Sequence, residues 1–291
     1  MAAAIKINDD DRHQYGDLNR RRPMMSTSNT ALVTGASAGI GAAYADRLAR
    51  RGHDLILVAR DEARLNALAE RLRVEAGRSV EVVVADLLAR PDLLRIEHRL
   101  RQDPTIGMLV NNAGVAASGP MHGSDVDRLE AMVNVNVTAA LRLAYAAVEG
   151  FLARGEGTLI NLSSVLALAP ERFNATYSGT KAFVLNLSTA LRTELADTGI
   201  RVQAVLPGAT CTEIWGKAGV DIAAMPADML MDVGEMVDAA LAGLDLGEAV
   251  TIPSLPDMAD WSRFNDARLA MGPNLSLAHA AERYKRAGEA A

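Results

Sequence analysis

The chain has 291 residues, which is enough for one large α/β domain or two smaller ones. Hydrophobic residues make up 49% and charged residues 23%, as in ordinary globular proteins, and the net charge of −6 argues against binding nucleic acid or anionic lipid. The sequence contains no run of 18 apolar residues, so no membrane span is predicted. The single cysteine, Cys211, fits a reducing cytoplasm. The five histidines lack the spacing of metal ligands, so no metal site is predicted.

Residues 1–28 differ from the rest of the chain because they are polar and have no apolar period. They lack the apolar core of a secretory signal, and Asp9, Asp10 and Asp11 argue against a mitochondrial targeting sequence. We therefore expect a disordered extension, of which the protein can lose residues 1–24 without harm.

From Thr30 onward, short apolar strands alternate with helical patterns. Strands are predicted within residues 30–35, 54–60, 80–87, 107–114, 157–164, 199–208 and 249–254. Helices are predicted over residues 39–52, 61–76, 91–101, 125–153 and 232–244, and around Tyr177. This alternation predicts a parallel, doubly wound sheet covered by helices on both faces, with ligands at the carboxyl ends of its strands.

The first strand leads into a glycine-rich turn, TGASAGIG, at residues 34–41. Gly35, Gly39 and Gly41 allow the backbone to approach a pyrophosphate, and the helix that follows offers N–H donors at its N-terminus. The spacing is not that of the common G-x-G-x-x-G fingerprint, so a merely tight turn is the alternative. The strand–turn–helix context favours dinucleotide binding.

The end of the second predicted strand indicates which dinucleotide would bind. NAD-binding folds usually place an acidic residue here for the ribose 2′-hydroxyl, whereas this chain has Ala59 and Arg60. A guanidinium group suits a 2′-phosphate. The neighbouring Asp61 is expected to cap the next helix. The pattern therefore favours NADP(H).

The segment YSGTK places Tyr177 and Lys181 four residues apart, on one face of a helix. Alone, the pair could be two amphipathic side chains on a helix surface. The alternative is a phenol whose pKa, ordinarily ~10, is lowered by the nearby ammonium group. Ser178 and Lys181 also match the S-x-x-K motif of acyl-transfer enzymes, but the companion S-D-N and K-T-G motifs are absent.

In combination, six motifs resemble the short-chain dehydrogenase/reductase family, in its simple one-domain branch, from about Thr30 to Pro253. They are TGASAGIG, NNAG at 111–114, NVNV at 134–137, INLSS at 160–164, YSGTK, and PGATCT at 207–212. The resemblance implies a single Rossmann-like domain with seven parallel strands. It also implies hydride transfer between NADP(H) and a small-molecule carbonyl or secondary alcohol. A homodimer or homotetramer paired through the alanine-rich helix at 125–153 is expected.

The resemblance also implies roles for individual residues. Those expected to be catalytic are Ser164, Tyr177, Lys181 and Asn136, the last chosen over Asn134 because of the VTAALRL run that follows it. Those expected to bind the cofactor are Gly35, Ser37, Gly39, Ile40, Gly41, Arg60, Asp86, Asn112, Ala113, Gly114, Tyr177, Lys181 and Thr212. Ser163 is expected to be structural. Taken singly, Asn112 and Asp86 could only close strand ends or cap a helix.

The substrate pocket is expected from residues 165–173 and from the segment after Thr212. That segment carries Trp215, Met225, Met229 and Met231, which suit an apolar small molecule. The NADP-binding domain is expected over residues 29–253. Residues 254–291 are expected to form a helical segment that covers the pocket or joins subunits, with its aromatic side chains buried.

Two rival classes of protein share this fold. One is a catalytically silent NADP-sensing protein, against which the intact Ser164, Tyr177 and Lys181 argue. The other is an epimerase or dehydratase of the family's longer branch. That branch has G-x-x-G-x-x-G at the first turn and a larger C-terminal domain, and this chain shows neither.

Overall fold

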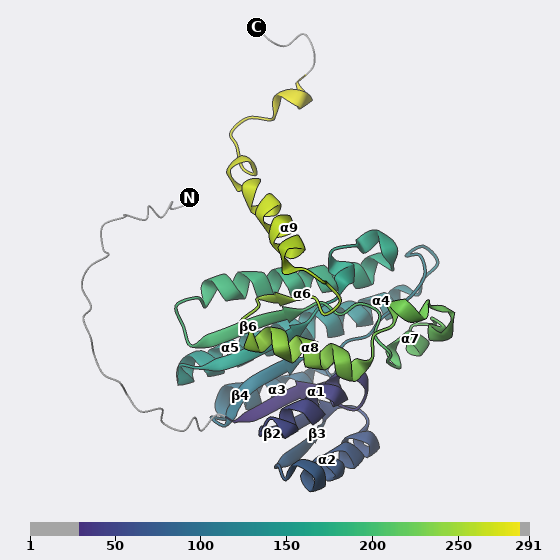
Figure 1. Ribbon diagram of the computed structural model, residues 1–291, viewed down its shortest axis with the longest axis vertical. Helices are drawn as coiled ribbons and strands as arrows, with labels where there is room; N and C mark the ends of the chain where they lie inside the picture. Colours follow the sequence, from purple (N-terminus) through teal and green to yellow (C-terminus); the bar gives the residue numbers. More distant parts are fainter. Residues whose placement is uncertain (1–28, 286–291) are drawn as a thin grey trace, which may run out of the picture.

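The computed structural model describes residues 29–285, so the extension expected over residues 1–28 lies outside it. Seven parallel strands form one sheet in the order β3-β2-β1-β4-β5-β6-β7 (Figure 1). The strands are β1 (Thr30–Thr34), β2 (Asp54–Ala59), β3 (Val80–Val84), β4 (Ile106–Asn111), β5 (Gly157–Leu162), β6 (Ile200–Val205) and β7 (Val250–Thr251). The predicted doubly wound, Rossmann-like sheet is confirmed.

Helices cover both faces of the sheet. The α-helices are α1 (Gly39–Arg50), α2 (Glu62–Ala76), α3 (Arg90–Gln102), α4 (Val126–Val133), α5 (Ala140–Arg154), α6 (Ala175–Glu194), α7 (Ile214–Lys217), α8 (Val233–Asp245) and α9 (Met258–Ala270). The short helical turns are η1 (Asn134–Ala139), η2 (Val165–Ala167), η3 (Pro170–Arg172), η4 (Ile222–Ala224), η5 (Ala227–Met229), η6 (Gly272–Asn274) and η7 (Glu282–Tyr284). Helices α1, α2 and α8 pack on one face, and α3, α5 and α6 on the other.

Each central strand is apolar on both sides because it contributes to two cores. In β1, Val33 belongs to the core beneath α1 and α8, whereas Leu32 belongs to the core beneath α3 and α5. In β2, Leu57 and Ile56 divide in the same way. This is why the strands appear in the sequence as nearly continuous apolar runs.

The helix predicted over residues 125–153 is interrupted by a π-helical turn, η1, between α4 and α5. By length and composition, the run Val126–Arg154 could cross a membrane, but 44% of its most apolar window is buried inside the domain. Core helices pass the same test. The alanines expected to pair subunits, Ala139, Ala140, Ala144, Ala146 and Ala147, are buried within their own chain. That basis for subunit pairing is therefore wrong, because α5 uses this face to pack on the sheet.

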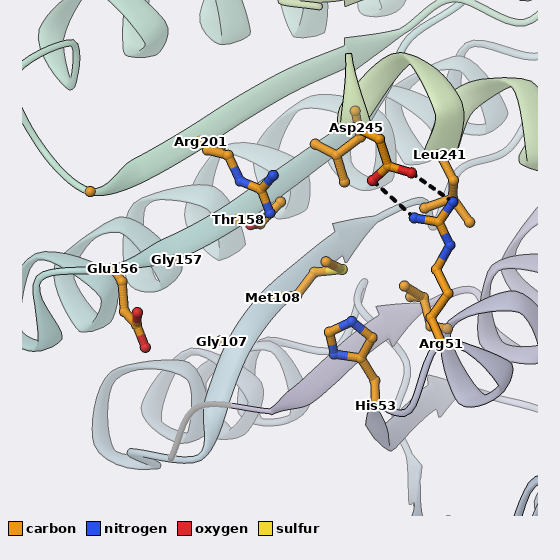
Figure 2. A pocket seen from close by; sticks show the side chains of 13 residues that line it. Arg51, His53, Gly107, Met108, Glu156, Gly157, Thr158, Arg201, Leu241 and Asp245 are labelled. Carbon is orange, nitrogen blue, oxygen red and sulfur yellow. Dashed lines mark hydrogen bonds and ion pairs between the residues drawn. The ribbon is translucent and has the colours of Figure 1, made fainter. Parts of the chain in front are cut away.

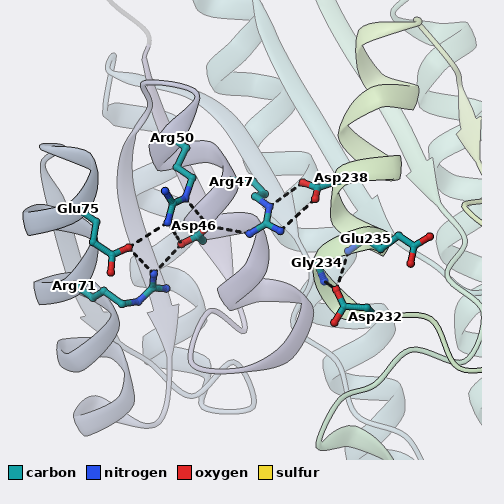
Figure 3. A network of polar contacts seen from close by, with 9 residues as sticks. All are labelled: Asp46, Arg47, Arg50, Arg71, Glu75, Asp232, Gly234, Glu235 and Asp238. Atoms are coloured by element: carbon teal, nitrogen blue, oxygen red, sulfur yellow. Dashed lines mark hydrogen bonds and ion pairs between the residues drawn. The ribbon is translucent and has the colours of Figure 1, made fainter.

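A buried carboxylate joins α1 to its neighbours on the same face of the sheet (Figure 3). The Asp46 side chain is 9% exposed and accepts hydrogen bonds from Arg47, Arg50 and Arg71 at 2.9, 3.0 and 2.8 Å. Arg47 also pairs with Asp238 of α8 at 2.8 Å. Burial opposes ionisation, but these hydrogen bonds hold the pKa of Asp46 at about 2.

The C-terminal arm, which we define as residues 258–285, projects away from the domain (Figure 1). Trp261 packs against the small core cluster of β6 and β7, but Phe264 is 50% exposed and Tyr284 is 69% exposed. Within this one chain only Trp261 is partly buried. The reason is geometric, because only the start of α9 lies close enough to the domain to touch it. The burial of Phe264 and Tyr284 against another subunit stays a prediction.

Candidate active site

The carboxyl end of β5 carries two adjacent buried serines that make different contacts. Ser163 Oγ donates to the Lys181 carbonyl oxygen at 2.7 Å, which ties the strand to α6 and agrees with its expected structural role. Ser164 Oγ accepts from the Leu166 N–H at 3.2 Å and reaches the Pro207 carbonyl oxygen at 3.4 Å. A long bond of this kind leaves the Ser164 hydroxyl free to turn toward another acceptor.

Tyr177 and Lys181 lie in the first two turns of α6, facing the end of β5. Lys181 is only 7% exposed, and its Nζ donates to the Leu162 carbonyl oxygen at 2.9 Å. The same Nζ lies 5.7 Å from the centroid of the Tyr177 ring. A buried ammonium group is costly to hold, so the interpretation as a surface pair fails.

The pKa values in this pair differ from the sequence-based expectation. Burial raises the pKa of Tyr177 to about 12, although a hydrogen bond with Ser164 acts in the opposite direction. Burial lowers the pKa of Lys181 to about 8. The expected lowering of the phenol's pKa is therefore not found. For both groups, loss of hydration has the largest effect on the pKa. The Lys181 ammonium group donates its hydrogen bond to the Leu162 carbonyl oxygen.

The π-helical turn η1 directs Asn136 toward this site. Asn136 is 2% exposed, accepts from the Val115 N–H at 2.9 Å, and donates to the Val115 carbonyl oxygen at 2.9 Å and to Thr180 Oγ1 at 3.1 Å. A Cβ atom on Gly114 would lie 3.2 Å from Asn136 Oδ1 and 3.6 Å from Lys181 Nζ. Asn134 is exposed. The structure thus brings Asn136, not Asn134, beside Lys181.

The glycine turn lies at the end of β1, and its geometry explains its composition. Gly35 and Gly39 have φ of +66° and +54°, a region that disfavours other residues. A Cβ on Gly41 would lie 2.3 Å from the Gly35 carbonyl oxygen, so the turn could not close around a larger residue. The N-cap residue of α1, Ala38, provides no side-chain cap, so the N–H groups of its first turn remain available to an anion. The turn therefore fits a dinucleotide pyrophosphate.

The remaining expected cofactor residues surround this turn. Ser37 lies within it, and Ile40 lies in the first turn of α1 and packs on the core. A Cβ on Gly39 would lie 3.2 Å from Thr212 Cγ2, so Thr212 borders the turn from the β6 side. Asp86 follows β3 and accepts from the Leu88 N–H at 3.0 Å. This local contact is the kind expected if Asp86 only closes the strand end.

Asn112 and Ala113 lie at the end of β4, where they are tied to β1. Asn112 Nδ2 donates to the Thr34 carbonyl oxygen at 2.8 Å, and the N–H groups of both residues donate to Thr34 Oγ1 at 3.0 and 2.9 Å. Thr34 is a contributor that the sequence analysis missed. Its only sequence signal is a hydroxyl just before the first glycine of the turn.

Arg60 lies immediately after β2 and is exposed. Within residues 29–285 its guanidinium has no hydrogen-bond or ion-pair partner. Asp61 caps α2 by accepting from the Arg64 N–H at 3.0 Å, as predicted. Arg64 itself makes a bidentate pair with Glu213 at 2.9 and 2.8 Å. Arg60 is therefore the cation at this strand end that is free to meet a phosphate.

Aromatic rings border the phenol on its other side. The Phe173 ring packs edge-to-face on Tyr177 and on Trp215, with centroids 5.6 and 6.0 Å apart. Trp215 Nε1 donates to the Thr210 carbonyl oxygen at 2.8 Å, which fixes the indole. Of the methionines expected here, Met231 instead packs on the core beneath α1, while Met225 is half-buried and Met229 exposed.

A separate cavity of about 290 Å³ opens at the opposite edge of the sheet (Figure 2). Arg51, His53, Met108, Thr158 and Arg201 are among the residues that line it, near the amino ends of the strands. Ligands of doubly wound sheets bind at the carboxyl ends, so this cavity is not part of the candidate site.

A parallel, doubly wound sheet with a glycine turn after β1 and a Ser-Tyr-Lys cluster beyond β5 defines a Rossmann-type dinucleotide-binding protein. The family model described as short chain dehydrogenase matches residues 29–222. The chain therefore belongs to the short-chain dehydrogenase/reductase family of oxidoreductases.

Solved structures agree with this assignment. A short-chain dehydrogenase from Sphingobium yanoikuyae in complex with NADPH is 51% identical, with a TM-score of 0.85, covering 88% of this chain and 99% of that one. The bulky-bulky ketone specific alcohol dehydrogenase of Comamonas testosteroni is 46% identical, with a TM-score of 0.82, covering 89% and 100%. Among curated protein sequences, the very-long-chain 3-oxoacyl-CoA reductase of Anas platyrhynchos is 36% identical over 63% of this chain, but only 60% of that protein is matched.

Proposed function

We propose that the protein transfers a hydride between NADP(H) and a carbonyl or secondary alcohol of an apolar small molecule. The observation that carries this proposal is the gathering of Ser164, Tyr177, Lys181 and Asn136 beside the glycine turn, at one edge of the sheet. The unpartnered Arg60 and the NADPH complex of the Sphingobium relative support NADP over NAD.

The protein's own groups would position and polarise the substrate. The cofactor, when bound, supplies or accepts the hydride. The Ser164 hydroxyl would donate to the carbonyl oxygen, and Tyr177 would transfer its phenolic proton to that oxygen. Since burial raises the pKa of Tyr177 to about 12, the phenol is protonated at neutral pH, which suits the reduction of a ketone. Lys181 would hold a positive charge beneath the phenol, and Asn136 would support proton exchange with solvent.

The substrate class follows from the aromatic surroundings of the phenol. Phe173 and Trp215 would accept a bulky apolar group beside the carbonyl, since aromatic rings stack favourably on one another. The Comamonas relative, specific for bulky-bulky ketones, supports this choice. A ketone flanked by an aryl group is therefore the first substrate to test.

The proposal is tested by NADPH oxidation with a panel of aryl and alkyl ketones. The wild-type protein should consume NADPH with an aryl ketone, whereas Tyr177→Phe should lose about 10²-fold or more in turnover while still binding NADPH. If the wild-type protein binds NADPH but reduces nothing across the panel, the silent NADP-sensing alternative is favoured instead. Fluorescence titration of NADPH provides the binding measurement for both proteins.

We also propose that the protein is a homo-oligomer. The outward side of α5 presents Leu141, Tyr145 and Leu152, which are 41%, 58% and 49% exposed. The C-terminal arm presents Phe264, Leu269, Met271, Leu275, Leu277 and Tyr284, all at least half exposed. Apolar surface of this extent is typical of subunit contacts. Residues 254–291 were expected either to cover the pocket or to join subunits, and the exposed apolar side chains of the arm favour contact with another subunit.

A further inference from the structure

One buried side chain links the backbone of Tyr177 to a loop beside the candidate site. Asn174 is 2% exposed and is the N-cap residue of α6. Its Oδ1 accepts from the Tyr177 N–H at 3.1 Å, and its Nδ2 donates to the Gly119 carbonyl oxygen at 3.0 Å. Both polar atoms of one amide are therefore used, one on each element.

The loop in question, residues 112–124, runs between β4 and α4 without regular structure and borders the site. Near its start, Val115 is held through both its N–H and its carbonyl by Asn136. Further along, the Ser118 hydroxyl donates to the Ala218 carbonyl oxygen, next to α7. Asn174 holds the loop at Gly119, so three side chains fix three successive points of it.

We propose that Asn174 is a positioning residue that makes the placement of the Tyr177 phenol depend on the order of this loop. The inference rests on the function proposed above. A helix that needed only a cap could use Ser, Thr or Asp at this position, since each supplies the acceptor. The Asn174 side chain differs from these residues because its Nδ2 also donates a hydrogen bond, here to the Gly119 carbonyl oxygen of the loop. Small displacements of a proton donor are costly to catalysis.

The two hydrogen bonds can be separated by substitution. Asn174→Ser keeps an acceptor for the Tyr177 N–H but has too short a side chain to reach Gly119 at the same time. Asn174→Ala removes both bonds. As a matched control for the loss of a cap elsewhere, Asp232→Ala removes the hydrogen bonds to Gly234 N–H and Glu235 N–H that cap α8 on the other face of the sheet.

Turnover and cofactor binding give the first measurement. Asn174→Ser should keep its melting temperature and its NADPH affinity but lose about tenfold in kcat for an aryl ketone. The reason is that the loop, no longer bonded at Gly119, stops holding the Tyr177 phenol in its productive position. Asn174→Ala should lose more kcat and also melt lower. Asp232→Ala should melt lower with kcat unchanged. A wild-type kcat in Asn174→Ser would overturn the inference while leaving the proposed function intact.

Hydrogen exchange gives a measurement that does not depend on turnover. In Asn174→Ser, amides of residues 112–124 should exchange faster than in the wild-type protein, whereas those of α6 should stay protected. Unchanged exchange in the loop would overturn the inference even if no ketone were ever reduced. Faster exchange in the loop together with an inactive wild-type protein would instead place the failure in the proposed function.

Discussion

At the scale of single residues, spacing identified the cluster but not its electrostatics. Ser164, Tyr177 and Lys181 are recognisable because a strand end and one helical turn place them at fixed intervals in the sequence. The pKa directions were not predictable, because they depend on how deeply each group is buried and on what Lys181 Nζ bonds. Asn174 and Thr34 were missed for a related reason, since single polar residues before a helix or a turn carry no distinctive spacing.

These pKa values predict how ketone reduction depends on pH. Tyr177 stays protonated through neutral pH, whereas Lys181, with a pKa of about 8, loses its charge as the pH rises through that value. The rate of reduction should therefore be level below pH 8 and fall above it. In Lys181→Met the charge is absent throughout, so the residual activity should show no such fall. A pH–rate profile with the same fall near pH 8 in Lys181→Met would contradict this assignment.

The free guanidinium of Arg60 predicts the preference for NADP. A charge-assisted contact with a 2′-phosphate is worth about 1.5–3 kcal/mol, so Arg60→Ala should weaken NADPH binding by about one to two decades. NADH binding should barely change. Arg64→Ala is the matched control, because Glu213 already occupies that guanidinium. Equal weakening of both cofactors in Arg60→Ala, measured by fluorescence titration, would make Arg60 a structural residue.

At the scale of elements, the sequence predicted most strands and helices because their apolar patterns follow directly from burial on two faces. It did not predict the π-helical turn at Asn134–Ala139, since one extra residue in a helical turn hardly alters an apolar period. It also assigned the alanines of α5 to a subunit contact. Small apolar residues suit packing against a sheet as well as against another helix, so composition alone could not separate the two.

The network around Asp46 predicts a stability effect between α1, α2 and α8 (Figure 3). Its pKa is lowered from 3.8 to about 2, so the unfolded chain takes up the proton first as the pH falls. The carboxylate therefore stabilises the fold fully above pH 4 and loses that contribution toward pH 2. Asp46→Asn should cost about 2 kcal/mol in the free energy of unfolding at pH 7.

Urea denaturation at several pH values measures this effect. The difference between wild type and Asp46→Asn should shrink steadily as the pH is lowered below 4. Asp238→Asn serves as the control, because its exposed carboxylate pairs with only Arg47 among residues 29–285 and should contribute much less. A difference for Asp46→Asn that stays constant with pH would show that lost packing, not charge, is responsible.

At the scale of the whole molecule, the C-terminal arm is the part least explained by one chain. The arm projects away from the domain (Figure 1). Within the described residues, Trp261 is its main attachment to the domain, and six of its other large apolar side chains are at least half exposed. A 13-residue helix such as α9 is barely stable in water by itself, so a second copy is the partner expected to stabilise it. From the sequence, the arm could be recognised as lying beyond the family's motifs. That it projects away from the domain could be learned only from the structure.

Removing residues 257–291 should therefore lower the oligomeric mass without unfolding the domain. The six exposed apolar side chains of the arm leave with it, whereas the sheet and the Ser164–Tyr177–Lys181 cluster stay, so far-ultraviolet circular dichroism and NADPH binding should persist. Light scattering at micromolar concentration should give a smaller assembly than for the full chain.

A protein beginning at Met25 is the control truncation, and it should keep the mass, melting temperature and activity of the full chain. If the C-terminally shortened protein keeps its mass, the arm does not join subunits. If the full chain is already a monomer, the proposed oligomer fails as a whole.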